Sequence, residues 1–101
     1  METAFATETL KDWFEANRAE LAELVHAHEF DAGSGRAASI QIQLPSQSAG
    51  ITTWDDGNRL EVIMVDGATG ESRVEDRSYP DREALEARLD ALLRQLLELR
   101  G

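Results

Sequence analysis

Hydrophobic positions in the first third of the chain recur at steps of three and four residues. This spacing places them on one side of a helix, so it predicts an amphipathic helix over residues 4–30. The glycine-containing segment 31–35 predicts the end of that helix. The hydrophobic stripe comprises Leu10, Trp13, Phe14, Leu21, Leu24 and Val25, with His28 close to it.

From residue 36 onward the period changes to two, which is typical of strands that bury one face. The alternation predicts a strand over residues 36–44 and, after a loop at 45–50, a second strand at 51–54. Residues 59–66 are apolar on both faces, which predicts a central strand. Residues 71–79 are more polar, and their alternating charges suit an edge strand, where charge opposes pairing with other chains.

Turn and cap residues divide the second half of the chain. Asp56 and Gly57 lie between two strand patterns and predict a hairpin with a type I′ turn, in which both central residues take positive φ. Residues 67–70 predict the next turn. Pro80 and Asp81 predict the start of a last helix, with Asp81 as its N-cap. Its buried stripe comprises Leu85, Leu89, Leu92, Leu96 and Leu99, widened by Leu93 and Leu97.

The predicted order is therefore helix, four strands, helix. Short connections between successive strands predict an antiparallel meander. We expect an α+β fold, in which a four-stranded antiparallel meander is flanked on one face by an N-terminal and a C-terminal helix. The other face is expected to stay at least partly open. With 101 residues, the chain has room for a single domain spanning 1–101.

Charge and composition narrow the partner classes. Twenty acidic residues oppose ten basic ones, giving a net charge of −10 at pH 7. Such a surface repels phosphate backbones, so we expect no nucleic-acid partner and favour a basic protein. The chain has no cysteine, which excludes disulfides and cysteine nucleophiles. No apolar run approaches the ~20 residues of a membrane span, and the acidic first residues lack signal-peptide features, so we expect a cytoplasmic protein.

Motifs that would carry catalysis or bind cofactors are weak in this sequence. His26 and His28 lie in the predicted helix, where residues two apart point to nearly opposite sides and cannot share a metal. The glycine turns at 33–35 and 67–70 lack the context of phosphate and dinucleotide loops. There is no Gly-x-Ser-x-Gly nucleophile elbow. We therefore expect no catalytic residues, no metal, no cofactor and no enzymatic activity.

The segment around the predicted hairpin is the best candidate for recognition. Its two adjacent aspartates have two interpretations that the sequence leaves open, namely turn chemistry and an acidic recognition loop. If Ile51 and Thr53 face the helices, Trp54 lies on the open face, where a large aromatic is typical of an interface hot spot. The predicted site for a protein partner comprises Trp54, Asp55, Asp56, Asn58 and Glu61.

Four segments resemble the TriTu family of bacterial immunity proteins. They are Lys-Asp-Trp-Phe at 11–14, Ala-Ser-Ile-Gln-Ile-Gln-Leu at 38–44, Ile-Thr-Thr-Trp-Asp-Asp-Gly at 51–57 and Tyr-Pro-Asp-Arg-Glu-Ala-Leu at 79–85. The resemblance implies an antitoxin for an effector of a type VI secretion system, used in interbacterial competition. It implies as target an ADP-ribosyltransferase toxin that modifies elongation factor Tu. Such an immunity protein would cover the NAD site or target site of the toxin domain.

Three alternatives to the immunity protein stay open at this point. A small acidic secretion chaperone would be an obligate dimer, whereas a free immunity protein is expected to be a monomer or a weak dimer. A small metal-dependent enzyme would use His26 and His28. A DNA mimic would need carboxylates at duplex-like spacing, which the interspersed basic residues make a poor fit. Reversal of Asp55 and Asp56 to lysine is expected to weaken protection from the toxin.

Overall fold

The fold combines two main helices with one antiparallel sheet, and the prediction of an α+β fold is confirmed. The computed structural model describes residues 4–31 and 35–100, so most of the predicted break at 31–35 lies outside the described residues. The elements are α1 (Ala6–Ala16), α2 (Arg18–Leu21), β1 (Val25–Asp31), β2 (Ala37–Gln43), β3 (Gln47–Trp54), β4 (Arg59–Asp66), β5 (Ser72–Ser78) and α4 (Arg82–Arg100).

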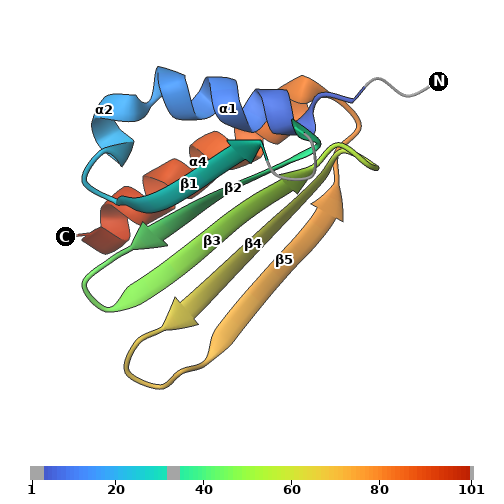
Figure 1. The fold of residues 1–101 in the computed structure, drawn as a ribbon. Helices are drawn as coiled ribbons and strands as arrows, with labels where there is room; N and C mark the ends of the chain where they lie inside the picture. The colour runs from blue at the N-terminus through green and yellow to red at the C-terminus, as the bar shows by residue number, and fades with distance from the viewer. Residues whose placement is uncertain (1–3, 32–34, 101) are drawn as a thin grey trace.

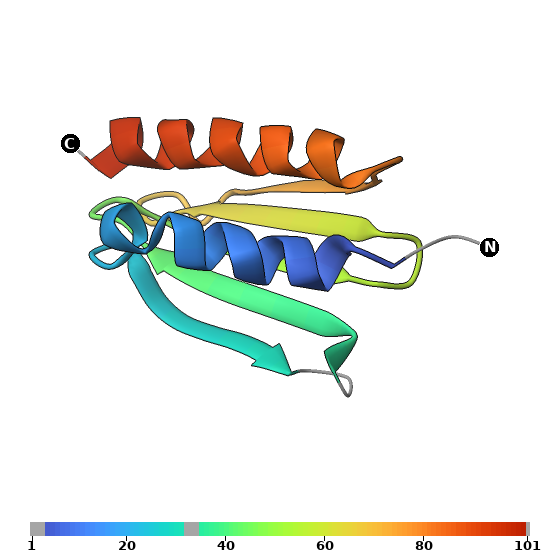
Figure 2. The same cartoon turned by 90° about the horizontal axis from the view of Figure 1, so that it is seen from above.

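The sheet is a meander of five strands in the order β1-β2-β3-β4-β5, with every neighbouring pair antiparallel. Figure 1 looks onto one face of it, with α4 behind the strands and the two ends of the chain on opposite sides of the molecule. Seen from above, α1 and α4 lie side by side (Figure 2). Both helices therefore belong to one layer, and the predicted meander with helices on one face is confirmed in outline.

The predicted number of strands is wrong, because residues 25–31 form β1 and not the end of a helix. Val25 lies opposite Ile42 and Ala27 opposite Gln41, so two steps along β1 match one step along β2. This bulge places Val25 and His28 on the same face of the sheet although they are three residues apart. Their spacing imitates the period of a helix, which explains the incorrect prediction.

The predicted helix over residues 4–30 ends early, at Asn17. The side-chain amide and the backbone N–H of Asn17 both donate to the carbonyl oxygen of Trp13, at 2.9 and 3.0 Å. These bonds satisfy a carbonyl that the last turn of α1 leaves free. A single further turn, α2, then carries the chain into β1. The hydrophobic stripe of this region is thus divided between a helix and a strand.

The hydrophobic core lies between the helix layer and one face of the sheet. Ile40, Ile51 and Val62 stand opposite one another on β2, β3 and β4, and all three are buried. Alternation along each strand directs their neighbours to the other face. The helices cover this row with the buried side chains Leu10, Trp13 and Phe14 of α1 and Leu85, Leu89, Leu92, Leu93 and Leu96 of α4.

The N-terminus of α4 follows the prediction. The Asp81 carboxylate accepts a hydrogen bond of 2.8 Å from the backbone N–H of Ala84, which is the bond of an N-cap. Two contacts then join α4 to α1. Trp13 donates its indole N–H to Asp90 at 3.1 Å, and Arg82 forms an ion pair of 2.6 Å with Asp12. The helix layer is therefore fixed by polar contacts at its surface as well as by the leucines beneath.

Candidate binding surface

The face of the sheet that points away from the helices forms an open surface of mixed character. Because Ile51 and Thr53 are buried against the helices, the alternate residues of β3 point outward, and the predicted placement of Trp54 on the open face is confirmed. The open face is polar on β2, and its apolar side chains are mostly Ile63 and Val65 of β4, with Val74 of β5 beside them. Its residues include Ser39, Gln41, Gln43, Ser48, Thr52, Trp54, Arg59, Glu61, Ile63, Val65, Val74 and Asp76.

A carboxylate cluster surrounds one guanidinium at the end of this face. Arg59 lies opposite Trp54 across the hairpin, and its guanidinium carbon is 4.8 Å from the centre of the indole ring. The same group donates two hydrogen bonds to Asp76 on β5, one of them 2.6 Å long. These hydrogen bonds lower the pKa of the Asp76 carboxyl and raise the pKa of Arg59. Trp54 is half-buried, so the stacked arginine holds its ring in place.

Glu61 adds a further negative charge to the cluster. It stands directly opposite Asp76 across the β4–β5 pair, and like charges in that position repel one another. Glu61 and Asp56 both raise the pKa of Arg59 through their charges, after the stronger effect of Asp76. Three carboxylates therefore share one arginine. Such an unbalanced arrangement beside an aromatic ring is suited to a cationic partner.

Two of the five predicted site residues turn inward and support α1. Asn58 accepts hydrogen bonds at its side-chain oxygen from the backbone N–H groups of Phe5, at 2.8 Å, and Ala6, at 3.2 Å. Asp55 accepts one from the N–H of Thr7 at 3.0 Å. They supply the cap that α1 lacks locally, since Phe5 at the N-cap position forms no side-chain cap bond.

The predicted site residues therefore divide into two groups. Asn58 is only 1% exposed, so its side chain is withdrawn from the surface. Asp55 is half-buried and its carboxylate is engaged by α1. Trp54 and Glu61 lie on the open face, and Asp56 is exposed at the tip of the hairpin. The structure thus brings Trp54, Asp56 and Glu61 to one surface, with the other two residues beneath it.

The hairpin itself is confirmed, but the predicted turn type is wrong. Trp54 pairs with Arg59, so the loop contains four residues. The positive φ angles fall on Gly57, at 75°, and Asn58, at 46°, whereas Asp56, which a type I′ turn would require to have one, does not. Asn58 is the non-glycine residue with positive φ in the described part of the chain. Asparagine tolerates this conformation better than most residues, and here it brings the side chain beneath α1.

Sequence reasoning missed Arg59 and Asp76 as members of the surface. A signal for Arg59 was present, because a four-residue loop between Trp54 and the next strand makes these two residues cross-strand neighbours. Asp76 could be placed only with the register of β4 against β5, and that register depends on the length of the turn at 67–70.

The two histidines lie on β1, with His28 in an aromatic group. The ring of His28 is 5.0 Å from that of Phe14 and 5.1 Å from that of Phe30, and these two phenylalanines are 5.2 Å apart. The bulge separates His26 from the regular alternation of β1. Within residues 4–31 and 35–100, no group of three or more histidine, aspartate or glutamate side chains could hold a metal ion. His28 is exposed, and its ring packs against the rings of Phe14 and Phe30.

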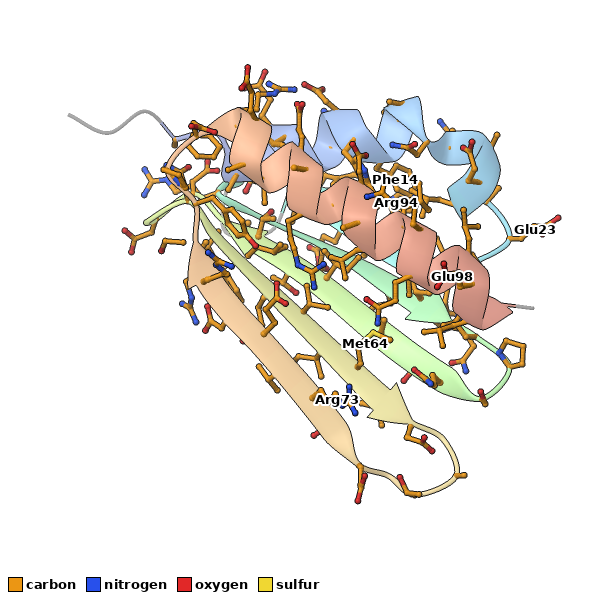
Figure 3. The ribbon with its side chains drawn as sticks, turned by 180° about the vertical axis from the view of Figure 1, so that it is seen from behind. Phe14, Glu23, Met64, Arg73, Arg94 and Glu98 are labelled. Atoms are coloured by element: carbon orange, nitrogen blue, oxygen red, sulfur yellow. The ribbon has the colours of Figure 1, made fainter. Side chains whose placement is uncertain are left out.

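Two open depressions lie elsewhere on the molecule. The larger, of about 530 Å³, is lined by residues of β4, β5 and α4 that include Met64, Arg73 and Leu99. Met64 and Arg73 are labelled in Figure 3. The second, of about 480 Å³, adjoins the start of α1 and includes Asp55. Trp54 lines neither of them. The candidate surface is therefore separate from both depressions.

An ion pair links α4 to the edge strand on the helix side of the sheet. Arg88 donates from Nε and Nη2 to the two carboxylate oxygens of Glu75, both at 2.8 Å. These hydrogen bonds lower the pKa of the Glu75 carboxyl below its ordinary value of 4.5. Tyr79 is buried close by, and burial raises the pKa of its hydroxyl.

Replacing Glu75 with glutamine is expected to lower the free energy of unfolding at pH 7 by about 1 kcal/mol, since the pair is partly exposed. The folded-state pKa of Glu75 lies below the unfolded value, so its contribution is present above pH 4.5 and is lost as the pH falls through the folded pKa. Urea unfolding at pH 7 and pH 3 measures this. E75Q should lose less stability than the unmodified protein between the two pH values, whereas exposed Glu98→Gln should follow the unmodified protein. Equal losses for E75Q and the unmodified protein would contradict the assignment.

Comparison of the chain with family models, with curated proteins and with solved structures found no match. None of the helices in the described part of the chain combines the length and the apolar character that a membrane span requires.

Proposed function

We propose that this chain is an immunity protein that binds and neutralises a cognate secreted toxin domain, of the ADP-ribosyltransferase class, in the cytoplasm. The open face would cover the active site or the target-binding site of the toxin. The observation that carries the proposal is the carboxylate cluster of Asp56, Glu61 and Asp76 around Arg59, next to half-buried Trp54. The resemblance of four segments to immunity proteins of the TriTu family supports the same class of function.

The cluster suits a partner whose surface is basic. Its carboxylates outnumber its cations, and the whole chain carries a net charge of −10. Charge of this kind raises the rate of association with a basic protein, while a fixed aromatic side chain supplies the buried contact that slows dissociation. Trp54 has few conformations to lose on binding, because Arg59 already stacks on its ring.

The test uses the cognate toxin domain, sought among the genes next to that of this chain and co-expressed with it in bacteria. D56K combined with E61K is expected to abolish the rescue of growth. It should weaken binding by about a hundredfold or more in calorimetry, because two carboxylates facing a basic partner are reversed. We choose Asp56 and Glu61 because reversal of Asp55 would also remove the cap on Thr7 and disturb α1.

The matched control is E20K combined with E98K, which changes the net charge equally at exposed positions of α2 and α4. This variant should still rescue growth and bind within about threefold of the unmodified protein, with a loss confined to the association rate. Equal rescue by both double variants would remove the open face from the proposed interface. Rescue lost equally in both would show that only net charge matters.

A further inference from the structure

The outer edge of β5 is not covered by another strand in the described chain. Figure 1 shows β5 at the end of the sheet, and Figure 3 shows its hairpin with β4 projecting beyond α4. Val74, the third residue of β5, is 61% exposed, and among the residues that the structure describes only Leu99 is a further exposed large hydrophobic side chain. An uncovered strand with an exposed apolar side chain is a template for pairing with another strand.

The ladder between β4 and β5 determines which backbone groups point to this edge. Asp66 donates its N–H to the carbonyl of Glu71, and Tyr79 donates to Asn58, so the hydrogen-bonded pairs fall on every second residue between them. Arg73, Glu75 and Arg77 therefore bond to β4. The N–H and C=O groups of Ser72, Val74 and Asp76 point outward instead.

We propose that a second copy of this chain pairs with β5 in antiparallel orientation, about a two-fold axis at Val74. An axis perpendicular to the sheet keeps the helix layers of the two copies on the same side. Residues on the helix side of one copy, which are odd-numbered in β5, therefore lie opposite odd-numbered residues of the other. With the axis at Val74, Arg73 lies opposite Glu75 of the second copy, and Glu71 lies opposite Arg77. Each of these opposite-charge pairs occurs twice, once on each side of the axis.

For axes at residues 73–77, every position other than Val74 places a charged residue opposite its own copy. An axis at Glu75 would place that carboxylate opposite its own copy and Arg73 opposite Arg77. An axis at Asp76 would place two aspartates against each other. Among axes at residues 73–77, the alternating charges of β5 thus favour only the one at Val74. Only the Val74 register also brings Val74 against its own copy, with Ile63 behind it on β4 of each chain.

The backbone supports the same register. Val74 would exchange N–H to C=O hydrogen bonds with Val74 of the second copy, and Ser72 would do so with Asp76 on either side of the axis. A single pair of strands buries much less than the roughly 1,600 Å² of a standard interface, so the dimer is weak and depends on concentration. It uses the edge of the sheet and does not depend on the proposed function.

Sedimentation velocity at concentrations from about 5 µM to about 1 mM should show a reversible monomer–dimer equilibrium. Glu71→Arg and Arg77→Glu are each expected to weaken dimerisation by at least about tenfold, since each creates two like-charge pairs. An equimolar mixture of E71R and R77E should associate at least about tenfold more strongly than either variant alone, because every pair in that mixed dimer has opposite charges. Neither a general loss of stability nor a change of net charge predicts this recovery.

Val74→Pro provides the backbone test. The N–H that proline lacks points outward, so the monomer keeps its ladder to β4, and far-UV circular dichroism and the melting temperature should change little. Dimerisation should fall by at least about tenfold. The proposal is overturned by a monomer at 1 mM, by a mixture of E71R and R77E no stronger than the single variants, or by a V74P dimer of unchanged affinity.

Discussion

Replacing Asn58 with alanine is expected to lower the free energy of unfolding by about 3 kcal/mol. Two backbone N–H groups at the start of α1, those of Phe5 and Ala6, would lose the oxygen that accepts their hydrogen bonds. Asn58 is 1% exposed, so water cannot easily replace that oxygen. Alanine would also have to adopt a φ of 46°, which costs an L-residue with a β-carbon roughly 1–2 kcal/mol.

Asn58→Gly separates these two contributions. Glycine adopts positive φ without strain, so N58G should be about 1 kcal/mol more stable than N58A while still losing the cap. Asp56→Ala, at the exposed neighbouring tip, should lie within about 0.5 kcal/mol of the unmodified protein. Urea unfolding followed by tryptophan fluorescence measures all three. An N58A variant as stable as the unmodified protein would show that the hairpin does not cap α1.

The cap also connects the stability of the fold to the candidate surface. Asn58 directly precedes Arg59, whose guanidinium holds both Trp54 and Asp76. The carbonyl of Asn58 accepts the N–H of Tyr79, just after β5. The same hairpin therefore caps α1 on the helix side of the sheet and positions Trp54 and Arg59 on the open face. We expect hairpin variants that loosen the cap to reduce affinity for a partner without removing any contact residue.

Three of the strands could be predicted closely because their signal is local, whereas β3 begins at Gln47, inside the segment 45–50 that was predicted as a loop. Residues 59–66 coincide with β4, and the predicted strands over residues 36–44 and 71–79 differ from β2 and β5 by one residue at the termini. Alternation of apolar and polar residues reports directly on a strand with one buried face, and glycine-containing turns mark its ends. The outward direction of Trp54 followed from the same alternation.

The parts that could not be predicted depend on partners far away in the chain. The bulge that gives β1 a three-residue spacing becomes visible only when β1 is paired with β2. The hydrogen bonds of Asn58 and Asp55 to α1 join residues that are 48 to 53 positions apart. No periodicity encodes such contacts, so two residues of the predicted binding site proved to be engaged inside the fold.

The core offers the second large effect, and α4 contains its own control. Leu89→Ala is expected to lower the free energy of unfolding by about 3–4 kcal/mol, because Leu89 is fully buried and its removal leaves a cavity. The predicted burial of Leu99 is wrong, because its side chain is 37% exposed. Leu99→Ala, which makes the same chemical change ten residues later, should therefore cost less than about 1 kcal/mol.

The difference between these two leucine variants tests where the helix layer ends. A small domain has a total stability of only about 5–15 kcal/mol, so L89A should shift the urea midpoint strongly while L99A should barely move it. Comparable costs at the two positions would mean that the end of α4 packs as tightly as its centre. The depression beside Met64 and Leu99 would then be closed in solution. In that case α4 would cover more of the sheet in solution than it does in this structure.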